Sequence, residues 1–125
     1  MARVSKGRWE VEFCRFRDSN PVVEELLDLK RRNVRLATEV VLDLKDLEEF
    51  GLELPDKRLH KLKGTPLWEL RSMWQHSIAR TLFFEHRGRL LVVTHIFQKK
   101  SGSIPRTAMR RGLERMELWR EDRKK

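Results

Sequence analysis

Three strand-like segments follow one another in the second half of the chain, separated only by short turns. They cover roughly 67–73, 77–86 and 89–97, and Arg87 and Gly88 supply the tight hairpin between the last two. The third segment is apolar on both faces, which predicts the central and best-buried strand. Neighbouring strands joined by short turns pair antiparallel, so we expect a small, mainly antiparallel sheet.

The first half of the chain predicts one strand followed by a helical region. Apolar and polar residues alternate over 9–14, as in a half-buried strand. Asn20 is placed to cap a helix, and Pro21 fits its first position. Helical spacing then continues for about 30 residues, which is long for one helix in a small domain. We therefore expect a break near 31–33 and an end of the second helix at Gly51.

The remaining segments complete a single domain spanning 1–125. Residues 52–66 read as a loop, and an apolar stripe predicts a last helix near 105–120. Residues 1–7 and 121–125 are expected to be flexible tails. The order β-α-α-β-β-β-α indicates an α+β domain, with two N-terminal helices and one C-terminal helix packed on one face of the sheet.

Positive charge is concentrated in the C-terminal half. The net charge is +9, and residues 61–125 carry 16 Lys and Arg against 6 Asp and Glu. A domain polarised in this way attracts polyanions such as nucleic acid, and salt weakens the attraction. The alternative is that many of these cations only solvate helix faces and a C-terminal tail.

Other classes are less compatible with the sequence. Cys14 is the only cysteine, which excludes disulfides and cysteine-based zinc sites within one chain, and its place in the first strand favours a core role over a nucleophilic one. No apolar run approaches the roughly 20 residues that span a membrane. The basic N-terminus leads into an alternating segment rather than a signal-peptide apolar stretch, so a cytoplasmic protein without membrane association is expected.

A group of cations lies on or just beyond the three predicted strands, without a matching set of carboxylates. These residues are Arg71, Arg80, His95, Lys99 and Lys100. Arginine holds two phosphate oxygens at once and stays protonated, and lysine among other cations can exchange a proton. Such a site suits a phosphodiester backbone.

Each of these residues also has a structural alternative. Glu69 lies on the same strand face as Arg71, so a salt bridge is the competing interpretation for the arginines. Arg80 falls on an apolar stripe, where a buried cation is costly, and this favours an open site at that face. His95 shares a strand face with apolar residues, where a histidine is often a hydrogen-bonded structural residue.

Several motifs in this region resemble one protein family. They are Lys61-Leu62-Lys63-Gly64, Leu67-Trp68-Glu69-Leu70-Arg71, Arg80 ahead of Phe83-Phe84, His95-Ile96-Phe97-Gln98-Lys99-Lys100, and Pro105. Together they resemble the RelE/HigB-like toxins of bacterial type II toxin–antitoxin systems, in the phage-derived branch of the RelE/ParE superfamily. The resemblance implies a RelE-like fold.

The resemblance also implies an activity and its partners. Family members are small basic endoribonucleases, many acting on mRNA in the ribosome, and each is silenced by an antitoxin encoded beside it, here expected to be a helix-turn-helix protein. Arg71 would be the strand cation, Arg80 the phosphate-facing arginine, and Lys99 and Lys100 the lysines after the strand, with His95 as a further catalytic candidate. The expected RNA-binding residues are Lys61, Lys63, Trp74, Arg106, Arg110 and Arg111.

One departure from the family pattern concerns the proton transfers. The chain has no tyrosine, whereas several relatives place one late in the fold. Phe83 and Phe84 can replace the packing of such a residue but not its phenol, so the general acid and base stay unassigned. No cofactor or metal is expected, because Glu69 and Glu85 are the only acidic residues between 57 and 113.

Two other functions remain open from the sequence. A ParE-like relative would keep the fold and poison a DNA topoisomerase without cleaving RNA, although the arginine and lysine set speaks against this. A catalytically inactive phage-derived protein would only bind RNA or a protein partner, and the missing tyrosine keeps this alternative open.

Overall fold

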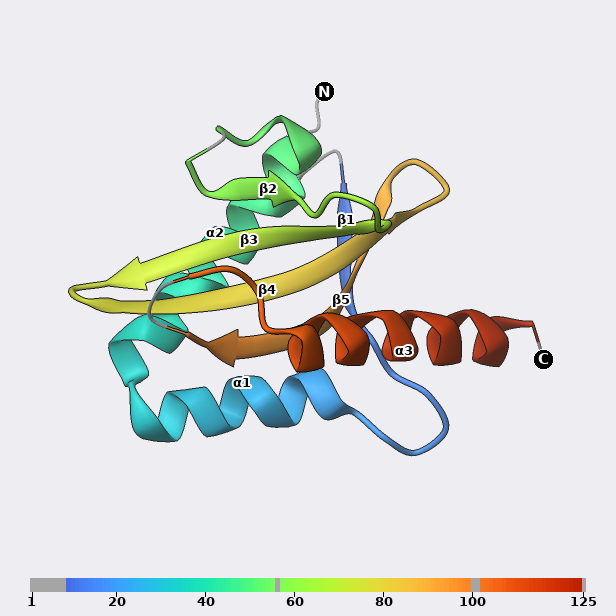
Figure 1. Ribbon diagram of the computed structural model, residues 1–125, viewed down its shortest axis with the longest axis horizontal. Coiled ribbons are helices and arrows are strands. Elements are labelled where there is room, and N and C mark those ends of the chain that lie inside the picture. The colour runs from blue at the N-terminus through green and yellow to red at the C-terminus, as the bar shows by residue number, and fades with distance from the viewer. Residues whose placement is uncertain (1–8, 56, 100–101, 125) are drawn as a thin grey trace, which may run out of the picture.

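A computed structural model describes residues 9–55, 57–99 and 102–124, and shows a five-stranded sheet with three helices around it (Figure 1). The α+β class with a mainly antiparallel sheet, two N-terminal helices and one C-terminal helix is therefore confirmed. The elements in chain order are β1 Glu10–Phe13, α1 Pro21–Arg32, α2 Val34–Phe50, the short 3-10 helix η1 Gly51–Glu53, β2 Leu59–Lys61, β3 Leu67–Trp74, β4 Ser77–His86, β5 Leu90–Gln98 and α3 Arg106–Arg123.

The strands are arranged in the order β1-β5-β4-β3-β2. All neighbours are antiparallel except β1 and β5, which run parallel with Val11 opposite Leu91. The central strand is thus β4, and the expectation that the third predicted strand would be central is wrong. Both strands are deeply buried, and the apolar character of β5 on both faces reflects its place between β1 and β4.

The helices lie on both faces of the sheet, which corrects the expectation of a single covered face. Helix α2 packs on β3 and β4 from behind in Figure 1, and α3 crosses the front. Gly112 lets α3 approach closely, because a Cβ there would lie 3.1 Å from Leu67 Cδ1 and 3.2 Å from Leu82 Cδ1. A sheet buried on both sides cannot show clean alternation, so its pattern does not reveal how many helices cover it.

The predicted helix break occurs at Asn33. Its backbone leaves the helical region, and its side chain accepts a hydrogen bond from the Leu36 amide at 3.1 Å, which starts α2. Gly51 ends α2 as expected, with φ of 56°, and a Cβ at this position would overlap the Trp9 ring. Pro21 begins α1, but the Asn20 side chain makes no capping hydrogen bond.

Other boundaries differ from the sequence-based expectation. The predicted loop at 52–66 contains the end of η1 and the short strand β2, whose buried Leu59 faces Leu70. Three residues are too few for a period-two pattern to identify a strand. Helix α3 continues to Arg123, beyond the predicted end at 120, while the predicted tail at 1–7 lies outside the described residues.

The core confirms the prediction for Cys14. This side chain is fully buried, and burial raises the pKa of its thiol to about 12, which makes it inert toward alkylation near neutral pH. Within the part of the chain that is described, no helix has both the length and the apolar character needed to cross a bilayer.

Candidate functional site

Two of the predicted catalytic arginines lie side by side on the sheet face that α3 partly covers. Arg71 on β3 is directly opposite Arg80 on β4, and Glu69 is two residues before Arg71 on the same face. Near the other end of β3, Leu67 lies under Gly112 of α3. Arg71 is four positions after Leu67 on β3, and Figure 1 shows β3 running from there toward the side of α3 on which the helix begins.

One carboxylate oxygen holds both guanidinium groups. Glu69 Oε2 accepts from Arg80 Nη1 at 2.7 Å and from Arg71 Nε at 3.2 Å. The side chains of Glu69 and Arg80 are only 2% and 3% exposed, whereas that of Arg71 is 37% exposed. Arg80 Nε also donates to the Lys99 carbonyl at 3.3 Å. We call these three side chains the arginine cluster.

The arginine cluster corrects the expected environment of Arg80. Glu69 and Arg71 share a strand face as expected, but Arg80 is not a solvent-facing cation. It forms the salt bridge that stood as the alternative: its Nη1 donates to Glu69 and its Nε to the Lys99 carbonyl, inside the sheet. The terminal nitrogens of Arg71, in contrast, have no partner among the described residues. Arg71 is therefore the arginine that can meet a phosphate directly.

Residues at the end of β5 lie next to the arginine cluster. Phe97 is directly opposite Arg80, and the Lys99 amide donates to the Ile78 carbonyl at 3.1 Å. The alternation of the strand thus continues to Lys99 and places it on the side of Arg80. Lys100, the other predicted catalytic lysine, lies outside the described residues.

His95 belongs to a different network. Its Nδ1 lies 3.1 Å from both carboxylate oxygens of Glu25, which also accept from the Ile96 amide at 2.9 Å and from Arg115 Nη1 at 2.8 Å. Arg115 reaches the Thr94 carbonyl as well, at 3.0 Å. Glu25 thus connects α1, β5 and α3 at the edge that β5 leaves open once β1 has ended. This geometry matches the structural alternative for His95.

The electrostatics of Glu25 fit this connecting role. Burial by itself raises the pKa of Glu25, but the hydrogen bonds from His95, the Ile96 amide and Arg115 outweigh it. The net result is a pKa below the ordinary glutamate value, which means that the folded state favours the ionised carboxylate.

Replacing Glu25 with alanine is expected to lower the free energy of unfolding by about 3 kcal/mol at neutral pH, since Arg115 and the Ile96 amide would lose their partner. The folded pKa is lowered, so this stabilisation is present above the unfolded pKa of about 4.3 and is lost as pH falls through the folded value. Urea titrations at several pH values measure the difference. The exposed neighbour Glu24, replaced in the same way, is the control.

A gap between parent and Glu25→Ala that stays constant from pH 7 down to pH 3 would contradict the ionised network. If Glu24→Ala lowers the free energy of unfolding as much as Glu25→Ala does, the stabilisation comes from the charge on the helix alone and not from the Glu25 network.

The predicted RNA-binding residues divide between the two sheet faces. By strand alternation Trp74 lies on the α2 face, where the Arg35 guanidinium covers its ring at 4.1 Å. Lys61 lies on that face too, 5.9 Å from the Trp68 ring, and the exposed Lys63 follows in the next turn. The three arginines of the set are exposed on the first two turns of α3, Arg106, Arg110 and Arg111. These three lie on the helix that partly covers the face of the arginine cluster.

Sequence reasoning gave no role to two further side chains. His60 pairs with Glu69 across β2 and β3, so it lies on the face of the arginine cluster, and its Nε2 is buried with no partner within the described part of the chain. The register of a three-residue strand was its only signal. Glu25 had none, because its contacts are 70 to 90 residues away.

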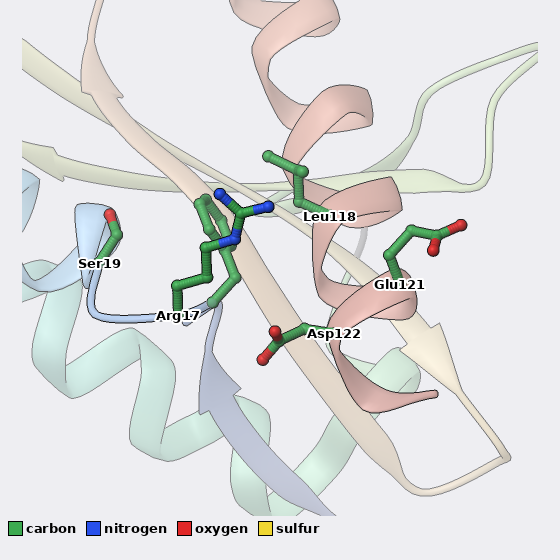
Figure 2. Close-up of a pocket in the computed structure, with 6 residues that line it drawn as sticks. Arg17, Ser19, Leu118, Glu121 and Asp122 are labelled. Carbon is green, nitrogen blue, oxygen red and sulfur yellow. The ribbon is translucent and has the colours of Figure 1, made fainter. Parts of the chain in front are cut away.

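A hollow of about 240 Å³ lies away from the arginine cluster, between the turn after β1 and the end of α3. Figure 2 shows Arg17 and Leu118 extending toward it, with Glu121 and Asp122 on α3 beside them. It contains none of the predicted site residues. Among the described residues, no three His, Cys, Asp or Glu side chains come together as a metal site.

Residues 24–117 match a protein family described as Phage derived protein Gp49-like (DUF891), which covers well over half of the chain. A search of curated proteins finds no match.

Proposed function

Because the chain belongs to the Gp49-like family of phage-derived proteins, we propose that it is the toxin of a type II toxin–antitoxin system and cleaves mRNA without a metal. The observation that carries this proposal is the arginine cluster. A buried carboxylate holds Arg71 by its Nε, and the terminal N–H groups of that arginine are left for a phosphate. Support also comes from the exposed arginines at the start of α3 and from the charge of the C-terminal half.

The charges of the cluster suit an anionic substrate. Two guanidinium groups share one carboxylate, which leaves one net positive charge on a largely buried group. Charge interactions are stronger where water is excluded, so this excess charge stabilises a phosphate that gains negative charge during the reaction. Arg80 acts indirectly, because it neutralises Glu69 and fixes the carboxylate oxygen of Glu69 beneath Arg71. Arg71 makes the phosphate contact.

The proposed reaction is an attack of the ribose 2′-oxygen on the adjacent phosphorus. A base takes the 2′-OH proton, the 2′-O–P bond forms, the P–O5′ bond breaks, and an acid protonates the departing 5′-oxygen. The products are a 2′,3′-cyclic phosphate and a 5′-hydroxyl. Lys99, whose strand position puts it beside Arg80, is our candidate for one proton transfer, and Lys100 for the other.

A cleavage assay tests the proposal directly. The purified chain is expected to cut free mRNA equally well in EDTA and in Mg²⁺, leaving 5′-hydroxyl ends. Ribosomes require Mg²⁺ to stay assembled, so cleavage of ribosome-bound mRNA is assayed in Mg²⁺ and judged by its 5′-hydroxyl ends. Mapping of the new 5′ ends gives the positions of cleavage. Loss of free-mRNA cleavage on chelation, restored by added Mg²⁺, would refute the metal-independent reaction.

Binding without cleavage is the second candidate function, and one observation favours it. Glu69 already engages both arginines, so the cluster is also complete as a structural ion pair. RNA that binds and stays intact under every condition of the assay, with or without ribosomes, would support this alternative.

The proposed partner is a helix-turn-helix antitoxin encoded by a neighbouring gene. A basic ribonuclease is harmful in its own cell unless it is neutralised, and carboxylates complement its charge best. Co-expression with the neighbouring gene is the natural test of this partner.

A further inference from the structure

A cationic hollow lies at the far end of the sheet from the β3–β4 turn. It has a volume of about 730 Å³ and lies between the β4–β5 turn and the last turns of α3, which occupy the same end of the molecule in Figure 1. Its cations are Arg87, Arg120, Arg123 and Lys124, and we call it the cationic pocket. His86 in its wall is six positions after Arg80 on β4, or about 20 Å of strand.

Aromatic rings hold two of these guanidinium groups in place. The Arg123 guanidinium lies 4.5 Å from the centre of the Trp119 ring, and that of Arg120 lies 5.2 Å from the Phe84 ring. Trp119 is itself buried and packs edge-on against His86 at 4.9 Å. A guanidinium stacked on a ring keeps the N–H groups of its plane free, and its orientation is already fixed before a ligand binds.

The carboxylates of the pocket do not neutralise its cations. Glu117 and Glu121 also line it, which leaves an excess of two positive charges among these side chains. Arg120 lies 3.9 Å from Glu117, an exposed pair of little strength. Arg87 and Arg123 have no carboxylate within 4 Å among the described residues.

His86 reports the resulting positive potential. Its pKa is lowered first by partial burial and then by repulsion from Arg123, Arg87 and Arg120, which together outweigh the opposing attraction of Glu12. The helix dipole explains why arginines favour the last turn of α3. It does not explain Arg87, which comes from the β4–β5 turn and adds a like charge to the same pocket.

We propose, on the basis of the proposed action on mRNA, that the cationic pocket binds the phosphate backbone of single-stranded RNA, at a place separate from the arginine cluster. Backbone phosphates recur along the strand, so one RNA strand can engage both places. The exposed arginines at the start of α3 lie on the same helix as Arg120 and Arg123 and supply further cations along it. The pocket thus contributes affinity independent of base sequence.

Binding of an RNA that cannot be cleaved tests this proposal independently of any nuclease activity. The probe is a fluorescent 2′-O-methyl oligonucleotide of 15 nucleotides, titrated with the full chain at 50 to 200 mM salt. The test variant combines Arg87→Asn with Arg123→Gln, and asparagine is chosen because Arg87 has a φ of 52°. We expect about tenfold weaker binding, and a slope of log affinity against log salt reduced by about 1.4 for two lost phosphate contacts.

A matched control removes two positive charges elsewhere. Lys30→Gln with Arg31→Gln on the exposed side of α1 is expected to change the affinity less than twofold. If both double variants lose RNA affinity equally, or if the pocket variant loses none, the proposal is overturned. Arg87→Asn alone, in an exposed turn, gives the same comparison if the double variant fails to fold, and a circular dichroism spectrum verifies folding.

Discussion

Replacing Glu69 with alanine is expected to destabilise the fold by about 3–5 kcal/mol, the largest effect of any single substitution in the site. The variant leaves Arg80 buried without its carboxylate partner, and a buried charge that loses its partner carries the full cost of its lost hydration. Urea unfolding at neutral pH measures the change. Glu85→Ala, an exposed glutamate on β4, is the control and is expected to change stability by less than about 0.5 kcal/mol.

A second variant distinguishes the role of the ion pair in RNA cleavage from its contribution to the stability of the fold. Glu69→Leu combined with Arg80→Met replaces the pair with apolar side chains of similar size, a change that is often neutral or stabilising. We expect this double variant to unfold near the parent while losing RNA cleavage. If Glu69→Ala unfolds like the parent, the pair is not buried as described; if the double variant cleaves RNA normally, the arginine cluster is not the active site.

These two expected results would explain why an ion pair is found inside so small a sheet. A leucine and a methionine would fill the space without the cost of removing two charges from water. Its presence is better explained by the way Arg80 neutralises Glu69 and holds the carboxylate oxygen against Arg71 than by a contribution to folding.

Local signals in the sequence predicted much of this arrangement. The spacing of Glu69 and Arg71 by two, and the short hairpin to β4, are enough to place both side chains on one face next to Arg80. The helix break at Asn33 was also local, because the length limit and a capping residue coincide there. Such features depend on neighbours within a few residues.

Burial and long-range pairing could not be predicted from local signals in this way. An arginine on an apolar stripe has the same pattern whether the face opens to solvent or carries a buried carboxylate, so the environment of Arg80 was mispredicted. The contacts of Glu25 with Arg115 join residues 90 positions apart. Since α3 and α2 occupy opposite faces, cations such as Lys61 and Arg110 that looked equivalent in the sequence are separated by the sheet.

Arg71→Ala is expected to reduce RNA cleavage by a hundredfold or more with little change in stability. Its terminal N–H groups are free for the phosphate, and one lost contact to developing charge typically costs several kcal/mol of transition-state stabilisation. Glu69 keeps its buried partner Arg80 in this variant, so the melting temperature should stay near that of the parent. Single-turnover cleavage by each folded variant, with a melting curve, gives both quantities.

Two comparisons make the Arg71 result specific to chemistry. Arg71→Lys keeps the charge but loses the fork that grips two oxygens, so it should restore only part of the rate. Arg111→Ala, on the exposed side of α3, should weaken RNA binding and its salt dependence while leaving the rate at saturating RNA nearly unchanged. Cleavage by Arg71→Ala at the parental rate, or a larger loss in Arg111→Ala, would place the reaction elsewhere on the protein.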